Sequence, residues 1–353
     1  MIEATYICME KYLNISAFFV GITTTFFTIF SLRILFYQKE RTRFQLVLGS
    51  IMAICAISCM KDLVLTFPGM YRQEVLNWVF VIDAWSALSY TVFVFEVVIP
   101  RWTTINRLIL LSLPFACFTI LYIVWPIQMV IYVLSAFLWC YGWTVIIIGW
   151  LKVQRHIKYV RANFSNIDRI DTTWLKPVFV FCIVSQLAWF FSSLYATMLT
   201  DIIYYISFIL LWLMVLRYSW NFRPIAANPE EDLPVSVQYV SPALAEGALE
   251  ILMDEQRLYL NKNLTLADLA QALNTNRTYV SQYLSQVRGQ TFYDYINQLR
   301  IQQVSIPMLK EHPEYTLEYV AYQSGFASIS TFRRAFLKLT GLSPRQYAVS
   351  DEL

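Results

Sequence analysis

The chain has 353 residues, of which 58% are hydrophobic, 17% aromatic and only 14% charged, with a formal net charge of +3. Soluble globular proteins usually carry about 25% charged residues, so this composition excludes a chain that folds entirely in water. The apolar residues are concentrated in positions 1–239, whereas positions 240–353 have the composition of a soluble protein. We therefore expect at least two domains, separated where the composition changes.

Seven segments in the first part are apolar and long enough to cross a bilayer, which takes about 20 residues in a helix. They are Asn14–Tyr37, Phe44–Thr66, Leu76–Ile99, Ile105–Trp125, Gln128–Leu151, Pro177–Leu199 and Ile202–Trp220. We interpret residues 1–222 as a seven-span transmembrane domain that has the lipid bilayer as a partner. The predicted fold class is all-α: a seven-helix transmembrane bundle followed by a soluble all-helical domain.

The positive residues that flank these segments predict the orientation of the bundle, because Lys and Arg collect on the cytoplasmic side of a membrane. Thirteen of them flank one set of segment ends, and only three flank the opposite set. We therefore expect a multi-pass protein with its N-terminus outside and its C-terminus in the cytoplasm.

Asp83 lies about two turns inside the third segment. An ionisable side chain at that depth is costly unless it is paired or solvated. Two interpretations stay open. Asp83 is either a candidate signal site that contacts an unknown small-molecule or peptide ligand, or the acceptor of a structural hydrogen bond from a neighbouring helix.

Residues 223–240 are typical of a linker. They contain Pro224, Pro229 and Pro234 together with the acidic run Glu230-Glu231-Asp232. Prolines at this spacing prevent a continuous helix, so we expect a semi-extended tether. The soluble domain, residues 241–353, should follow it close to the inner leaflet.

The soluble domain contains a weak internal repeat of a two-helix motif. The matching pairs are Thr265 and Thr316, Ala270 and Ala321, Val280 and Phe332, and Leu284 and Phe336. The threonines are expected to cap the first helix of each copy. Asn274 and Gly325 are residue types that tolerate a left-handed turn. Each copy therefore has the pattern of a helix-turn-helix, with its second helix over 277–287 or 328–339.

At this point the chain resembles the AraC family, also called the AraC/XylS family, of bacterial transcription regulators. Residues 325–336 are similar to the family's second recognition motif, and residues 292–300 to the start of its connecting helix. The usual ending of the family is present as Gly341, Ser343-Pro344 and Tyr347. The resemblance covers about residues 244–349 and does not extend to 1–239. It implies an AraC-type domain in which one connecting helix holds two motifs in successive major grooves of double-stranded DNA.

The resemblance also implies which residues contact DNA. The positions that match the family's base-reading sites are Thr278, Ser281 and Gln282 in the first motif and Ser330 and Arg334 in the second. Arg pairs with guanine and Gln with adenine. The better candidates for phosphate contacts, which position a protein without specifying sequence, are Arg277, Arg333, Lys338 and Arg345.

Three features depart from the family's pattern. Pro307 is expected to end or kink the connecting helix early. Ala348 stands where the family often has a basic residue. From Val240 onward, 10 Lys and Arg residues stand against 11 Asp and Glu residues, although positions 319–350 contain four basic residues and no acid. The positive charge is therefore local, and we expect modest non-specific affinity for DNA.

The sequence offers no pattern of an enzyme, a cofactor site or a metal site. His156 and His312 are the only histidines, and no cysteines form a metal-type or redox-type pair. No phosphate-binding glycine loop or nucleophile motif is present either.

The leading hypothesis is a membrane-embedded, one-component transcription regulator of the bacterial inner membrane. Its transmembrane domain would sense a signal, and its cytoplasmic domain would bind promoter DNA sequence-specifically. In a homodimer, the signal could change how two cytoplasmic domains lie side by side. The alternative is a transporter-like or simply anchoring membrane domain with a constitutive DNA-binding or interaction appendage.

Overall fold

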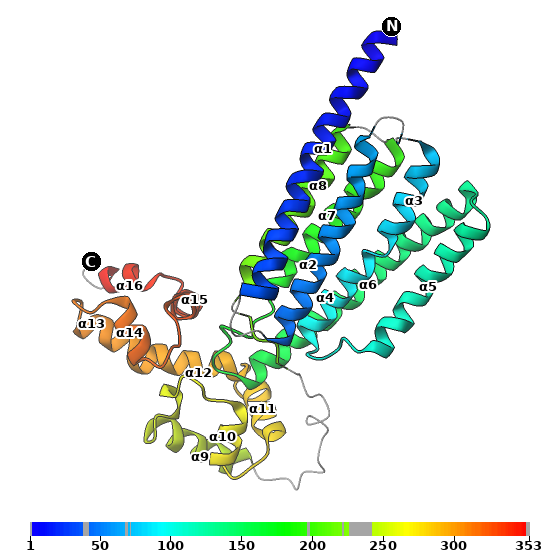
Figure 1. Ribbon diagram of the computed structural model, residues 1–353. Helices are drawn as coiled ribbons and strands as arrows, with labels where there is room; N and C mark the ends of the chain where they lie inside the picture. The colour runs from blue at the N-terminus through cyan, green and yellow to red at the C-terminus, as the bar shows by residue number, and fades with distance from the viewer. Residues whose placement is uncertain are drawn as a thin grey trace. The chain divides into compact units, whose positions relative to one another are not determined.

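The computed structural model describes residues 2–37, 42–67, 70, 72–195, 198–220, 222–225 and 242–350. These residues fold almost entirely into helices (Figure 1), and none of the described residues forms a β-strand. The predicted all-α class is confirmed. The chain divides into two compact units: an apolar unit of residues 1–154 and 172–226, and a C-terminal unit of residues 155–171 and 227–353.

The apolar unit is built from long helices. Its described α-helices are α1 (Ile2–Leu32), α2 (Arg43–Lys61), α3 (Gln73–Ala84), α4 (Ala87–Val98), α5 (Ile105–Val124), α6 (Gln128–Asn163), α7 (Leu175–Tyr195) and α8 (Met198–Ser219). A π-helical turn over Arg33–Tyr37 follows α1, and a 3-10 turn over Asp62–Thr66 follows α2. Helix α1 packs against α2 and α8, and α7 packs against α8, so these four helices run side by side (Figure 1).

Five helical segments in the described part of the chain are long and apolar enough to cross a membrane. They are Ala17–Tyr37, Arg43–Leu65, Gln73–Val98, Ile105–Val124 and Gln128–Asn163. The sixth and seventh predicted spans overlap α7 and α8, in which the described apolar stretches, Leu175–Phe191 and Tyr205–Ser219, are shorter. The count of seven spans therefore stays a prediction.

The third predicted span consists of two helices, α3 and α4, rather than one. At the junction, the Ser86 hydroxyl donates to the carbonyl oxygen of Asp83 at 2.7 Å. A serine that bonds a nearby carbonyl in this way competes with regular helical hydrogen bonding. Helix α3 ends at Ala84, and α4 begins at Ala87.

Aromatic side chains and one buried carboxylate hold the apolar unit together. Phe27 of α1 and Phe93 of α4 each lie 5.8 Å, between ring centroids, from the buried Trp212 of α8. Glu96 of α4 is 1% exposed and accepts hydrogen bonds from the backbone N–H and the hydroxyl of Thr103, at 2.8 and 2.6 Å. A buried carboxylate needs such donors, so Glu96 fixes the turn between α4 and α5.

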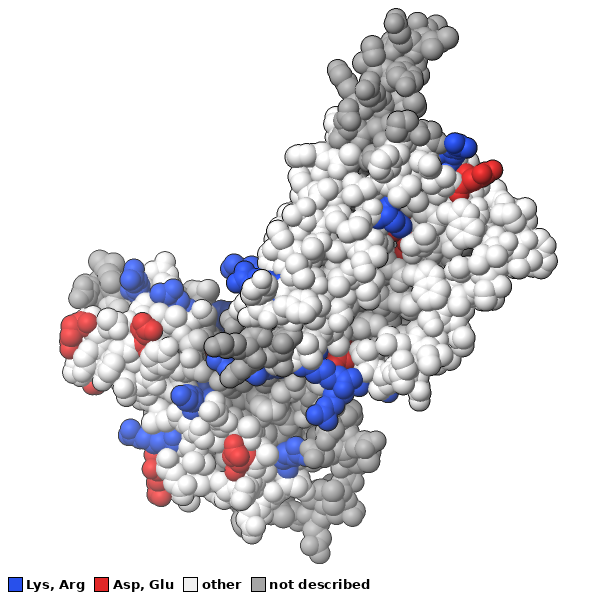
Figure 2. All heavy atoms as spheres, in the orientation of Figure 1, with Lys and Arg blue, Asp and Glu red and all other residues white. Residues whose placement is uncertain are grey.

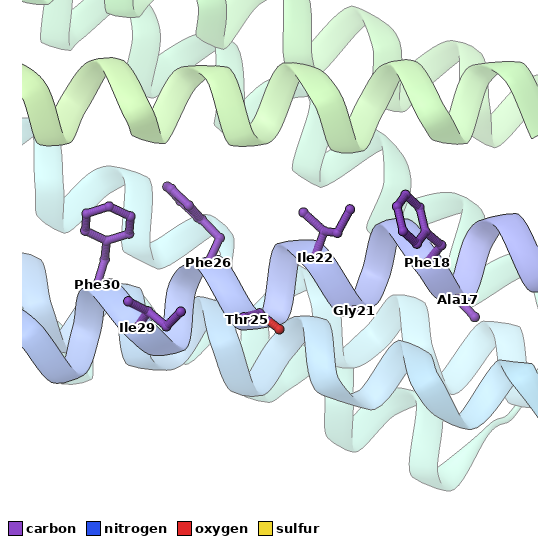
Figure 3. A pocket seen from close by; sticks show the side chains of 8 residues that line it. All are labelled: Ala17, Phe18, Gly21, Ile22, Thr25, Phe26, Ile29 and Phe30. Carbon is purple, nitrogen blue, oxygen red and sulfur yellow. The ribbon is translucent and has the colours of Figure 1, made fainter.

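The outer surface of the apolar unit is hydrophobic. The face seen in Figure 2 carries few charged side chains. A shallow apolar groove on α1 is lined by residues of that one helix (Figure 3): Ala17, Phe18, Gly21, Ile22, Thr25, Phe26, Ile29 and Phe30. Phe18 and Ile29 are both more than half exposed, so the groove is an outward helix surface rather than an enclosed ligand cavity.

The C-terminal unit is built from short helices around two cores. These helices are α9 (Pro242–Asp254), α10 (Leu266–Ala272), α11 (Arg277–Gln286), α12 (Phe292–Arg300), α13 (Ile306–Glu311), α14 (Leu317–Gln323), α15 (Ile329–Thr340) and α16 (Pro344–Ser350), with a 3-10 turn over Leu258–Leu260. One core is formed by residues 249–296 and the other by residues 301–336. Residues 155–171, which precede α7 in the sequence, belong to this unit as well.

Most of the predicted linker, residues 226–240, lies outside the described residues. The domain boundaries at 222 and 240 therefore stay predictions.

Candidate nucleic-acid interface

The first helix-turn-helix motif consists of α10 and α11. Thr265 caps α10 as predicted, because its hydroxyl accepts from the backbone N–H of Asp268 at 3.2 Å. Asn274 has the predicted left-handed conformation, with a φ of 51°. Val280 and Leu284 are buried in the first core. One face of α11 is thus fixed by packing, and the opposite face is left for contacts outside the domain.

The second motif, α14 and α15, repeats this construction. The Thr316 hydroxyl caps α14 by accepting from the backbone N–H of Tyr319 at 3.2 Å. Gly325 has a φ of 83°, and a Cβ at this position would lie 2.7 Å from the carbonyl oxygen of Leu260. Only glycine fits both the conformation and the space. Phe332 and Phe336 are fully buried, with ring centroids 5.6 Å apart.

The connecting helix continues past the point where Pro307 was expected to end it. A π-helical turn over Ile301–Ser305 precedes α13, and Pro307 lies in the first turn of α13. Proline is tolerated there because the missing N–H would have no helical partner. The Ser305 hydroxyl donates to the carbonyl oxygen of Arg300 at 3.1 Å. The expected ending was therefore wrong, because the chain stays helical from the π-helical turn into α13, and the other expectation, a kink at Pro307, stays a prediction.

Arg300, at the end of α12, is 1% exposed and is held by backbone oxygens. Its Nε donates to the carbonyl oxygen of Tyr259 at 2.6 Å, and its Nη2 donates to that of Asn261 at 2.8 Å. The same Nη2 lies 3.3 Å from the hydroxyl of Ser165. Burial lowers the pKa of the Arg300 guanidinium to about 10, so it remains charged at neutral pH. This role of Arg300 was not predicted from the sequence.

The predicted base-reading residues lie on the second helix of each motif. Gln282, Ser330 and Arg334 are exposed, and Thr278 and Ser281 are half-buried. They alternate with the buried residues at helical spacing, so they face away from the two cores. Gln282 and Arg334 occupy equivalent positions in α11 and α15. The geometry is compatible with insertion of these faces into a groove, and the individual base contacts stay predictions.

The predicted phosphate-contact residues lie on or near the same helices. Arg333, Lys338 and Arg345 are exposed, and Arg277, the first residue of α11, is half-buried. The ammonium group of Lys338 lies 2.7 Å from a carboxylate oxygen of Asp294 on α12. Exposed ion pairs of this kind are worth about 0–1 kcal/mol. Asp294 therefore leaves Lys338 able to exchange partners.

Two aspartates that were not predicted from the sequence, Asp168 and Asp171, lie beside the second recognition helix. Thr331 on α15 donates its hydroxyl hydrogen to a carboxylate oxygen of Asp168. Carboxylate oxygens of Asp168 and Asp171 lie 3.9 and 4.0 Å from the guanidinium of Arg334. The two acids come from the segment between α6 and α7, more than 150 positions away in sequence, so no local pattern could have indicated the contact.

Asp83, in the apolar unit, makes a contact to a neighbouring helix. Its Oδ1 accepts from the hydroxyl of Ser58 on α2 at 3.2 Å and lies 2.7 Å from the ammonium group of Lys61. Lys61 also pairs with Asp62 at 2.5 Å. The interhelical hydrogen bond is one of the two interpretations that the sequence left open. A role as a signal site stays a prediction.

The C-terminal part of the chain is similar to known helix-turn-helix proteins. A family profile described as "Helix-turn-helix domain" matches residues 269–349. The TCP pilus virulence regulatory protein of Vibrio cholerae serotype O1 is 36% identical over 88 residues, which is 25% of this chain and 31% of that protein. An uncharacterized HTH-type transcriptional regulator of Staphylococcus aureus (strain COL) is 26% identical over 104 residues, 30% of this chain and 14% of that protein. No solved structure matches.

Residues 269–349 form an AraC-type helix-turn-helix domain.

The AraC-type domain includes all nine residues predicted to contact DNA, because they lie between positions 277 and 345. The chain spans less than a third of the length of the two relatives described above, and both matches cover only about a quarter to a third of this chain. The family profile also leaves the apolar unit outside its range. The resemblance to the AraC family is therefore confirmed for the C-terminal part of the chain.

Proposed function

We propose that this protein is a membrane-embedded, one-component transcription regulator. One observation carries the proposal: an AraC-type domain with two outward-facing recognition helices lies in the same chain as five helical segments, counted among the described residues, that are long and apolar enough to cross a membrane. The domain binds promoter DNA sequence-specifically, and the membrane helices sense the signal that sets its activity.

DNA recognition depends on the outward faces of α11 and α15. Gln282 and Arg334 are long, exposed side chains at equivalent positions, with the hydrogen-bonding groups that pair with adenine and guanine in a major groove. Thr278, Ser281 and Ser330 complete the two base-reading faces. Arg277, Arg333, Lys338 and Arg345 bind phosphates and fix the register.

The proposed location is the inner membrane of a bacterium, with the N-terminus outside and the AraC-type domain in the cytoplasm. The excess of Lys and Arg at one set of span ends supports this orientation. It also satisfies a functional requirement, since only the cytoplasmic side gives access to the genome. A single apolar helix would suffice as an anchor, and the larger number of apolar helices here favours a receptor.

The signal acts on the apolar unit. Lys61, Asp62 and Asp83 are ionisable groups joined between α2 and α3, and such groups within spans often mark functional sites. A small molecule or peptide could replace Lys61, Asp62 or Asp83 in one of these ion pairs. It would favour one arrangement of the helices, provided that it binds the two arrangements with different affinity. In a homodimer, that change would alter the spacing of two AraC-type domains.

The test is base specificity measured on the full-length protein in lipid nanodiscs. Duplexes recovered from a randomised pool should share a motif that extends over two successive turns of the major groove. Arg334→Ala should cost about 1–3 kcal/mol and relax specificity at one base position, whereas Lys338→Ala should weaken all sequences alike and reduce the dependence on salt. Recovery of no common motif would contradict the proposal.

A further inference from the structure

The segment between α6 and α7, residues 164–171, packs in the C-terminal unit, which contains the AraC-type domain. Its Phe164 forms an isolated antiparallel bridge with Thr265. The backbone N–H and the hydroxyl of Ser165 donate to the carbonyl oxygen of Leu264, at 3.2 and 2.6 Å. Ser165 and Ile167 are 1% and 2% exposed. The segment is thus anchored at its start by buried backbone and side-chain contacts, including the contact with Arg300.

The other end of the segment carries two carboxylates to the second recognition helix. Asp168 accepts the hydrogen bond of Thr331. A carboxylate oxygen of Asp168 lies 3.9 Å from Nη2 of Arg334, and one of Asp171 lies 4.0 Å from Nη1. The carboxylates are mostly covered, with exposed fractions of 22% and 16%, whereas Arg334 remains 60% exposed. Arg334 therefore faces solvent and two acids at once.

We propose that residues 164–171 are a built-in competitor of DNA, in which Asp168 and Asp171 occupy the guanidinium of Arg334 and must leave before the second recognition helix binds a major groove. This inference rests on the proposed function, because it concerns the regulation of the same interface.

Two physical effects make the bound segment and bound DNA mutually exclusive. Carboxylates and the acceptor edge of guanine use the same N–H groups of an arginine, so Arg334 cannot serve both fully. In addition, two negative charges at the recognition helix repel the phosphates that flank a groove. The distances of 3.9 and 4.0 Å are longer than hydrogen bonds. The contact with Arg334 is accordingly weak enough to be displaced.

The backbone joins this competitor to two apolar helices. The segment follows α6, which includes the predicted fifth span, and precedes α7, which includes part of the predicted sixth. A signal that changes the ends of these helices would act on residues 164–171 through the chain itself. Such a route does not require a second copy of the protein.

The first experiment measures the affinity of the full chain in lipid nanodiscs for a duplex recovered from a randomised pool. Asp168→Asn/Asp171→Asn should raise the affinity at least about fivefold, the lower end of typical coupling between sites. The matched control is Glu250→Gln/Asp254→Asn, which removes two carboxylates from α9 and should change the affinity less than twofold. In an Arg334→Ala background the gain should become smaller, because only the repulsion between the two carboxylates and the phosphates is then removed. Equal gains in the loop and control variants would overturn the proposal.

The second experiment locks the contact. In Asp168→Cys/Thr331→Cys, oxidation should form a disulfide and lower the affinity for the same duplex, and reduction should restore it. Disulfide formation without loss of affinity would overturn the competitor proposal and leave the proposed function intact. If neither the wild type nor any of these variants bound duplex DNA in either redox state, the proposed function would fail as well, and the competitor proposal with it.

Discussion

Replacing Arg300 by alanine is expected to destabilise the C-terminal unit more than any exposed arginine would. The guanidinium is buried and donates to the carbonyl oxygens of Tyr259 and Asn261 and to the hydroxyl of Ser165. A buried acceptor that loses its donor costs about 1–3 kcal/mol. Because three acceptors lose theirs and some admit water, we expect a loss of about 3–5 kcal/mol in the free energy of unfolding, in the range seen when one partner of a buried charged pair is removed.

The measurement is pulse proteolysis in urea of the full-length protein in inside-out membrane vesicles, with the C-terminal unit followed through an epitope tag. With a slope of about 1.5 kcal/mol per molar urea, the midpoint should fall by about 2–3 M. Arg300→Lys keeps the charge but lacks the planar guanidinium, so its urea midpoint should lie between those of the wild type and Arg300→Ala.

Arg288→Ala is the matched control. Its guanidinium lies 3.1 Å from a carboxylate oxygen of Glu250, and both side chains are at least 35% exposed. An exposed pair contributes about 0–1 kcal/mol, so the midpoint should hardly move. If Arg300→Ala lowered the midpoint no more than Arg288→Ala, the inference that Arg300 holds these backbone segments together would be refuted.

The remaining predictions concern the backbone, the signal and the topology. Gly325→Ala should lower the free energy of unfolding by about 2–4 kcal/mol, because it combines left-handed strain with a Cβ 2.7 Å from the carbonyl oxygen of Leu260. Gly341 has a φ of 75° in open space, so the control Gly341→Ala should lower it by only about 1–2 kcal/mol. Equal urea midpoints for the two variants would contradict the steric clash at Gly325. Asp83→Asn keeps the size but weakens the contact with Lys61, so target-gene response should change at unaltered membrane abundance; an unaltered response returns Asp83 to a structural role. A reporter active only in the periplasm and fused after Phe222 should be inactive, and one active only in the cytoplasm should be active; the reverse pattern would rule out access to DNA.

Features encoded by neighbouring residues could be predicted from the sequence. Thr265 and Thr316 cap their helices, and Asn274 and Gly325 take left-handed conformations, because capping and turn preferences depend on a few adjacent positions. The apolar segments indicated helices for a similar reason, since length and hydropathy are local properties. The individual DNA contacts rest on the resemblance to the AraC family rather than on physical derivation.

Features that depend on tertiary packing could not be predicted in the same way. Pro307 lies in the first turn of α13, where proline is tolerated, because a π-helical turn over Ile301–Ser305 precedes it. The sequence did not indicate this turn. Asp168 and Thr331 are 163 positions apart, and Ser165 and Arg300 are 135 apart. The sequence of residues 164–171 gave no indication that Asp168 and Asp171 would lie beside α15. These contacts follow from the fold, and no periodicity records them.

The central claim is that the membrane-embedded chain itself binds specific genomic DNA through α11 and α15. The most direct measurement is cross-linking of the tagged, full-length protein to DNA in living cells, followed by sequencing, with wild type and Gln282→Ala/Arg334→Ala compared at equal abundance in the membrane fraction. The account predicts discrete enriched sites that share one motif in the wild type and their loss in the double variant. Enrichment that persisted unchanged in the double variant, or a wild type without enriched sites, would contradict it.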